Sequence, residues 1–165
     1  MFKKIYLLTF LTCASTPALG MSSLPELERQ LNHVKTQMLT MKRVWNTARL
    51  RIKIAEKTSS TLYQTIKPTL DRVISNNEFT TKLDTLASEQ LNSIVNDYMS
   101  FASTKKTFDI SDFFPNVTLN TFGKTLFSAM VDKEYCLMLG RKLAQKMQEL
   151  EMTITSIQQT LATSY

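Results

Sequence analysis

A single heptad repeat constrains the fold of this 165-residue chain more than any other feature. Apolar residues recur at alternating spacings of three and four positions from Leu24 to Ile66, and only Ser59 among them is polar. Such spacing places the residues on one face of an α-helix and is typical of a helix that packs against other helices along its length. The repeat runs through Leu24, Leu27, Leu31, Val34, Met38, Met41, Trp45, Ala48, Ile52, Ala55, Ser59, Leu62 and Ile66.

Pro68 follows the repeat and should end or kink the helix, because proline lacks the backbone donor that a helix interior requires. We therefore predict a helix from about Leu24 to Lys67, about 65 Å long at 1.5 Å per residue. A rod of that length needs partner helices beside it or a second copy of the chain. The residues expected to make this contact, here called the packing stripe, are Leu27, Leu31, Val34, Met38, Met41 and Trp45.

The rest of the chain also shows helical periodicity. Ser75–Glu78 predicts a turn with a capping box, and the helix after it should reach about Ser103. An irregular insertion near 104–120 precedes a last helical region, Asn120–Thr163, in which Gly140 is either a close-packing point or a weak spot. Three glycines in the whole chain disfavour a β-rich or loop-rich fold. The sequence therefore predicts an all-α fold, an elongated bundle of three to four helices with a very long, coiled-coil-like N-terminal helix.

The N-terminus has the parts of a bacterial secretory signal. Two lysines precede an apolar run, Ile5–Leu11, which is far shorter than the ~20 residues that a spanning helix needs. Small side chains precede the expected cleavage point between Gly20 and Met21. We predict that residues 1–20 are a signal peptide and that residues 21–165 form a single helical-bundle domain without an integral membrane span.

The two cysteines leave alternatives open. Cys13 follows Phe-Leu-Thr, which resembles a lipobox, so lipidation at Cys13 is the alternative to cleavage after Gly20. If Cys13 is removed with the signal, Cys136 remains alone and no intramolecular disulfide can form. Cys136 is then a buried, inert thiol, or it pairs between chains in an oxidising compartment.

The positive charge of the chain is mild and spread out. The formal net charge is +6, and cleavage would remove two lysines from it. The densest basic patch combines Lys42 and Arg43 with Arg49, Arg51 and Lys53. We interpret this patch first as a solvated helix face and second as a docking site for an acidic partner. Nucleic-acid binding ranks after both, because an exported protein does not meet nucleic acid in the cytoplasm.

Residue patterns for catalysis and metal binding are missing from the sequence. His33 is the only histidine and lies beside the packing stripe, whereas a metal site needs several converging ligands. Nucleophilic catalysis would need His33 next to a positioned hydroxyl or thiol, and no glycine-rich loop is present to hold a phosphate. Asp109 and Asp112 are expected to cap helices rather than bind calcium. We predict a protein that is not an enzyme and that uses no cofactor or metal.

One apolar cluster lies inside the irregular insertion. Phe108, Ile110, Phe113 and Phe114 place four large apolar groups within seven residues. These side chains either fill the open end of the bundle as core or form an exposed loop that contacts a partner protein. They are our candidate partner-contact residues.

The expected signal peptide is followed directly by LPELERQLNHVKTQMLTMKRVW, and the chain ends in KLAQKMQELEMTITSIQQTLATSY. This arrangement resembles the minor pilin subunits of bacterial type IV secretion and conjugation systems. Members often have a Leu-Thr-Gly type segment after the first helix, where this chain reads NTARLRIKIAEKTSS. The resemblance covers the architecture of most of the mature chain.

The resemblance implies an exported structural or adhesion component that acts in pilus assembly and cell contact. Such a protein would contact other subunits, the major pilin and secretion-channel components among them, in the periplasm, at the outer membrane or on a surface pilus. Two other functions remain open. One is a periplasmic coiled-coil chaperone or scaffold that forms homo-oligomers through the heptad repeat, and the other is a lipoprotein anchored at Cys13.

Overall fold

The computed structural model describes residues 23–105 and 107–163, and every regular element in these ranges is helical. The all-α fold predicted from the sequence is therefore confirmed. The predicted signal peptide, its cleavage point and Cys13 lie outside the described residues. The elements are α1 (Leu24–Thr58), α2 (Ser60–Ile74), α3 (Asn77–Asn96), the short α4 (Phe101–Thr104), the 3₁₀ turn η1 (Ile110–Asp112) and α5 (Thr121–Thr163).

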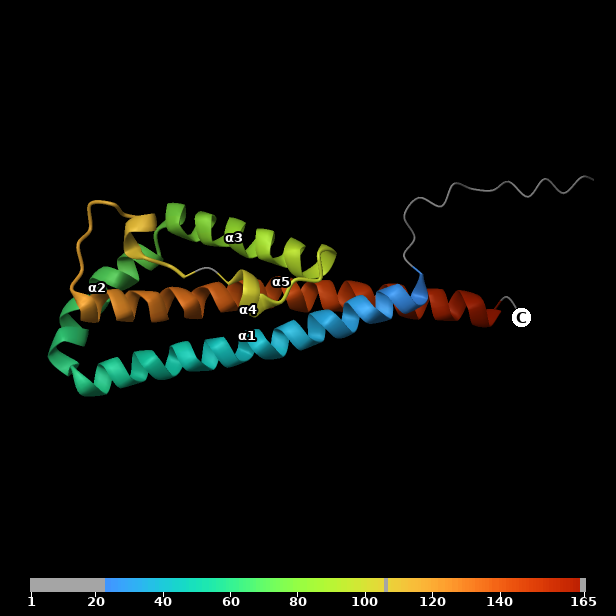
Figure 1. Cartoon of the computed structure of the whole chain (residues 1–165), viewed down its shortest axis with the longest axis horizontal. Coiled ribbons are helices and arrows are strands. Elements are labelled where there is room, and N and C mark those ends of the chain that lie inside the picture. Colours follow the sequence, from blue (N-terminus) through green and yellow to red (C-terminus); the bar gives the residue numbers. More distant parts are fainter. Residues whose placement is uncertain (1–22, 106, 164–165) are drawn as a thin grey trace, which may run out of the picture.

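Helices α1 and α5 run antiparallel and define the long axis of an elongated bundle (Figure 1). α1 has 35 residues and α5 has 43, which corresponds to about 52 and 65 Å at 1.5 Å per residue. α3 lies along α5, and α2 crosses the end of the α1–α5 pair (Figure 1). The long first helix thus packs on the last helix of its own chain.

The first helix ends earlier than predicted. α1 stops at Thr58 rather than near Lys67, and Ser59 leaves the helical conformation with φ −142° and ψ 54°. Pro68, which we expected to end or kink this helix, lies inside α2 instead. The expected boundary is wrong because the chain turns at Ser59 and not at the proline. Ser59 is the one heptad position that carries a polar side chain.

The turn at Ser59 also shifts the helical face that is buried. In α2 the buried side chains are Tyr63 and Leu70, whereas the heptad residue Leu62 is 46% exposed. A heptad predicts burial only while the helix stays straight and keeps the same neighbour. α2 packs on the end of the bundle instead, so a different set of its residues faces the core.

The second helical region begins at the predicted turn, where Asn76 provides a side-chain cap but no capping box forms, and it ends earlier than predicted. α3 begins after Asn76, whose side chain accepts a hydrogen bond from the backbone of Glu78 at 2.8 Å. It ends at Asn96, not near Ser103 as predicted, and Tyr98 then takes a left-handed φ of 53°. A non-glycine residue at positive φ interrupts a right-handed helix. The helix therefore divides into α3 and the short α4.

The irregular insertion contains one turn of 3₁₀ helix. The side chain of Asp109 accepts from the backbone of Ser111, and the side chain of Asp112 accepts from the backbone of Asp109, both at 3.0 Å. These two bonds form a capping box, so the expected capping role of the two aspartates is confirmed.

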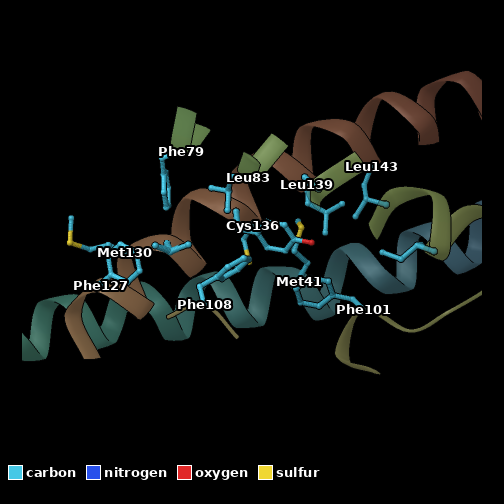
Figure 2. Packing of buried hydrophobic residues seen from close by; sticks show 14 of the residues in the cluster. Met41, Phe79, Leu83, Phe101, Phe108, Phe127, Met130, Cys136, Leu139 and Leu143 are labelled. Carbon is cyan, nitrogen blue, oxygen red and sulfur yellow. The ribbon is translucent and has the colours of Figure 1, made fainter. Parts of the chain in front are cut away.

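The hydrophobic core lies where α3 and the insertion pack against α1 and α5. Figure 2 shows side chains from these segments converging around Phe108 and Cys136. Aromatic rings dominate one end, where Phe79 of α3 lies 6.2 Å from Phe127 of α5 between ring centroids. Burying one such side chain contributes about 1.5–3 kcal/mol. Of the described helices, none combines the length and apolar character needed to cross a membrane.

Candidate interaction surface

The apolar cluster of the insertion faces inward. Phe108 and Ile110 are 6% and 2% exposed, and the Phe108 ring lies 5.2 Å from that of Tyr135. Phe113 and Phe114 are half-buried against the core, and Phe113 lies 4.5 Å from Phe79. Phe108 and Ile110 therefore belong to the hydrophobic core in this fold. The insertion covers the end of the bundle, which corresponds to the core alternative left open above.

The packing stripe lies between α1 and its neighbours. Val34 and Met41 are buried, and the four other members, Leu27, Leu31, Met38 and Trp45, are half-buried against the same core. Met41 packs on Gly140 of α5, where an added Cβ atom would lie 2.9 Å from the methionine methyl group. Gly140 is thus a close-packing point in an unbroken helix, not a weak spot.

One side of the α1–α5 pair is left open as an apolar groove of about 520 Å³. All of its lining residues belong to α1 or α5, so no third helix covers it. We define the α1/α5 groove by its floor and walls: Met38, Leu39, Met41 and Trp45 from α1, and Cys136, Leu137, Gly140 and Ala144 from α5. Leu39 at its edge is 62% exposed, the largest exposure of any bulky apolar side chain in the described residues.

The charges at the rim of this groove are positive. Lys42 of α1 and Arg141 of α5 line it, and no carboxylate does. The Arg49 guanidinium lies 4.6 Å from the centroid of the Trp45 ring, in cation–π geometry. Lys42, Arg49 and Arg141 form no ion pair with any described residue. Further along the same two helices, Lys35 does pair with Glu151, at 2.9 Å.

Trp45 carries an unsatisfied polar atom in this groove. Its indole Nε1 is buried and has no acceptor among the described atoms. A buried donor left without a partner costs about 1–3 kcal/mol. The ring is thus held by packing and by Arg49 rather than by a hydrogen bond.

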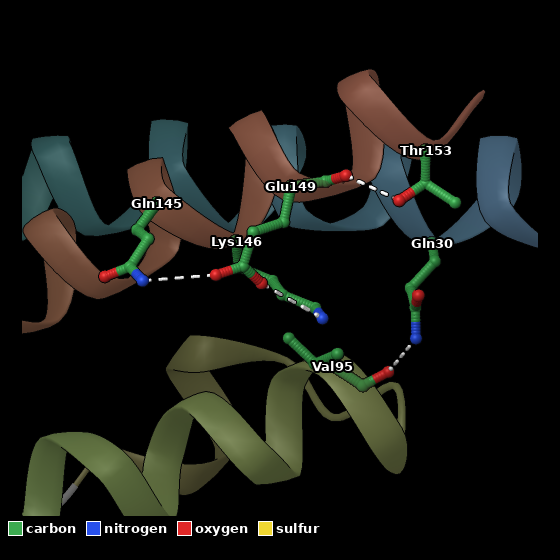
Figure 3. A network of polar contacts seen from close by, with 6 residues as sticks. All are labelled: Gln30, Val95, Gln145, Lys146, Glu149 and Thr153. Atoms are coloured by element: carbon green, nitrogen blue, oxygen red, sulfur yellow. Dashed lines mark hydrogen bonds and ion pairs between the residues drawn. The ribbon is translucent and has the colours of Figure 1, made fainter. Parts of the chain in front are cut away.

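A row of polar residues on α1 was missed by the sequence analysis. Gln30 donates to the carbonyl of Val95 at 2.9 Å (Figure 3), and Gln37 accepts from the backbone N–H of Phe101 at 2.8 Å. Together with Glu26 and His33 they fasten the turn between α3 and α4 onto α1. The signal was present as polar residues at 26, 30, 33 and 37, a spacing of four, three and four beside the apolar stripe.

His33 belongs to this row of contacts. Its Nε2 lies 3.2 Å from the carbonyl oxygen of Met99, and its ring is 5.3 Å from that of Tyr98. Tyr98 also donates to Glu26, which accepts from Arg29 at 2.9 Å. These two bonds, that from Arg29 foremost, lower the pKa of the Glu26 carboxyl. Across the described ranges, no three His, Cys, Asp or Glu residues come together as a metal site.

A second buried polar contact holds the insertion to α5. Lys105 pairs with Asp132 at 3.0 Å, and their side chains are 22% and 6% exposed. Cys136, one turn further along α5, is 2% exposed. Burial, with a smaller contribution from the Asp132 carboxylate, raises the pKa of the Cys136 thiol to about 12. The thiol is therefore protonated at neutral pH and enclosed by the protein.

A cavity of about 510 Å³ lies where α2 crosses the bundle, and residues of α1, α2, α3 and α5 line it. Its charged residues are already paired with each other, Lys67 with Asp71 and Lys133 with Glu134. Tyr63 and Met138 contribute to its apolar wall. This arrangement leaves no free charge for a ligand, so the α1/α5 groove is the stronger candidate for an interaction surface.

Comparison of the chain with protein-family models, with curated proteins and with solved structures finds no match.

Proposed function

We propose that this protein is an exported, non-enzymatic structural component, a minor pilin of a type IV secretion or conjugation system that acts in pilus assembly and cell contact. The observation that carries the proposal is an elongated helical bundle that leaves an apolar, cation-rimmed groove open between its two longest helices. A subunit of a filament must present such surfaces to its neighbours. The secretory character of residues 1–20 and the resemblance of the two long segments to minor pilins support the same function.

The mechanism would be helix packing rather than chemistry. Apolar side chains of a neighbouring subunit would enter the α1/α5 groove, and burial of apolar surface would supply the binding free energy. In this mechanism Cys136 stays buried in the core, and His33 contacts the backbone carbonyl of Met99. A helical rod stiffened by the α1–α5 contact would keep the spacing between its two ends fixed within an assembly.

Export is tested by fusing residues 1–20 to alkaline phosphatase, which is active only outside the cytoplasm. We expect phosphatase activity that disappears when Lys3 and Lys4 are replaced by glutamate. Radiolabelled palmitate tests the alternative anchor, since a lipoprotein would incorporate label that Cys13→Ser abolishes. An inactive fusion would contradict the proposal.

Filament association is tested by mechanical shearing of the cells that carry the gene. We expect the protein in the sheared surface fraction, and we expect it to leave that fraction when pilus assembly is blocked. A protein that stays in the periplasm and binds unfolded outer-membrane proteins would instead be a chaperone, and the pilin proposal would then be wrong.

A further inference from the structure

We propose that the α1/α5 groove binds an acidic amphipathic helix of a partner protein. This inference rests on the part of the proposed function that assigns assembly to helix packing, and it names the chemistry of the partner. The purified protein is sufficient to test it. A failure here is therefore distinguishable from a failure of export or of pilus association.

The shape of the groove suits a helix. Two antiparallel helices that lie side by side leave a furrow into which a third packs at an axis separation of about 8–10 Å. The floor between Met38 and Trp45 spans about 10 Å, or two helical turns. Gly140 is packed against Met41 and carries no side chain, and Ala144 carries only a methyl group, so no long side chain at these two positions fills the groove. Apolar side chains at positions i, i+3 and i+7 of that helix would reach the floor.

The floor is apolar and adaptable. Half-buried Met38 contributes a flexible thioether side chain, which adjusts to the shape of a ligand better than a branched residue does. Leu39 is 62% exposed at the edge and would be covered by an occupant. A partner that buries Leu39 and the open face of Trp45 would remove apolar surface from water, the main source of favourable free energy in such contacts.

The charges determine which helix fits. Lys42 and Arg141 stand on opposite walls, and neither has a carboxylate partner in the described part of the chain. An occupant with glutamate or aspartate on both flanks of its apolar face would supply the missing partners. A second copy docked groove to groove would place these cations against their own counterparts, which disfavours self-association through this surface.

Trp45 makes the groove observable. It is the only tryptophan in the chain, so its fluorescence reports on this surface alone. The ring lines the groove beneath Arg49. A helix that covers Trp45 would exclude water from the exposed part of the ring and shift its emission to shorter wavelength.

The test titrates purified protein with a synthetic peptide of about 16 residues, with leucine at i, i+4, i+7 and i+11 and glutamate on both flanks. We expect a saturable blue shift of Trp45 emission that weakens when the ionic strength rises from about 0.05 M to about 0.5 M. A peptide with lysine in place of every glutamate should bind at least about tenfold more weakly. Equal binding of both peptides, or no binding of either, would overturn the proposal.

Charge reversal on the protein locates the site. We expect the double variant Lys42→Glu/Arg141→Glu to weaken binding of the acidic peptide at least about tenfold and to improve binding of the lysine peptide. Arg43→Glu is the matched control, since Arg43 is exposed, adjacent in sequence and outside the groove, and it should change affinity less than about twofold. Circular dichroism must show the same helicity for all variants. An unchanged affinity in the double variant would refute the assignment.

Two further readouts exclude other occupants. Sedimentation with vesicles of anionic phospholipid tests a membrane surface, and analytical ultracentrifugation tests a second copy of the chain. We expect no vesicle binding that depends on Lys42 and Arg141, and no dimer that the double variant dissociates. If vesicle binding depends on Lys42 and Arg141, the groove binds a membrane surface, and if the double variant dissociates a dimer, the groove binds a second copy. Each of these two outcomes would overturn the proposal of an acidic partner helix.

Discussion

At the scale of single residues, burial separates side chains that look equivalent in the sequence. Met38 and Met41 occupy neighbouring positions of the same heptad, yet Met41 is 7% exposed beneath Gly140 while Met38 is half-buried at the open groove. Lys42 and Lys35 lie seven residues apart on one face of α1, but only Lys35 meets a carboxylate, that of Glu151. Two residues of the same type on α1 can therefore differ in whether a partner could reach them, because the helix that faces each of them differs.

We expect Met41→Asp to unfold the bundle. The substitution would place an unpaired carboxylate at a buried position, with a cost of several kcal/mol. Lys53→Asp on the exposed side of the same helix is the control and should change the free energy of unfolding by less than about 0.5 kcal/mol. Urea denaturation followed by circular dichroism measures both. Native helicity and an unchanged midpoint in Met41→Asp would show that the stripe is not required for folding.

Cys136 should react slowly with thiol reagents in the folded protein. Burial raises its pKa to about 12 from an ordinary value of 9.0, so the reactive thiolate is scarce at pH 8. The same shift favours the fold while the thiol is protonated. This contribution is complete below about pH 9 and is lost as the pH rises toward about 12. We expect alkylation by iodoacetamide to accelerate strongly in urea, and equal rates with and without urea would contradict the buried assignment.

At the scale of elements, the polar row on α1 decides where α3 stops. Gln30, His33 and Gln37 contact backbone groups between Val95 and Phe101, and the N–H of Phe101 is buried where it donates to Gln37. α3 therefore ends at Asn96 in spite of apolar residues that continue beyond it. Helical periodicity in the sequence cannot reveal this end, because the acceptors and donors that stabilise it come from another helix.

Gln37→Leu should lower the free energy of unfolding by about 1–3 kcal/mol, since it leaves the buried N–H of Phe101 without its acceptor. Hydrogen exchange at this amide should accelerate more than exchange in the centre of α5. Gln64→Leu, on the exposed face of α2, provides the matched control and should be close to neutral. Equal stability of the Gln37 variant and wild type would show that this bond does not hold the turn.

At the scale of the whole molecule, stability depends on the overlap of α1 with α5. The buried residues of α5 extend from Gly123 to Ile154, and Leu161 near its end is 50% exposed. The last turns of α5, after Ile154, therefore lengthen the helix but contribute no buried side chain to the core. The core itself needs both ends of the chain, because its largest contact joins α1 to α5.

A stop after Ile157 should leave the melting temperature within a few degrees of that of the full chain, because residues 158–163 are exposed. A stop after Lys142 should prevent cooperative folding, because it removes Leu143 and Leu150, which are 0% and 3% exposed. Differential scanning calorimetry compares the two. A cooperative transition in the shorter chain would place the stabilising core elsewhere.

The heptad and the scarcity of glycine determined by themselves that this chain is helical, elongated and built on a long apolar stripe from Leu24 onward, because side-chain spacing alone decides which helix face avoids water. The capping role of Asp109 and Asp112 could also be predicted from the sequence, because it depends only on residues that are close together in the chain. Tertiary structure decided the rest: the turn at Ser59, the end of α3 and the burial of Phe108. It also decided which side of the α1–α5 pair stays uncovered. These features depend on which surfaces meet across long sequence separations, and no local pattern of residues encodes that choice.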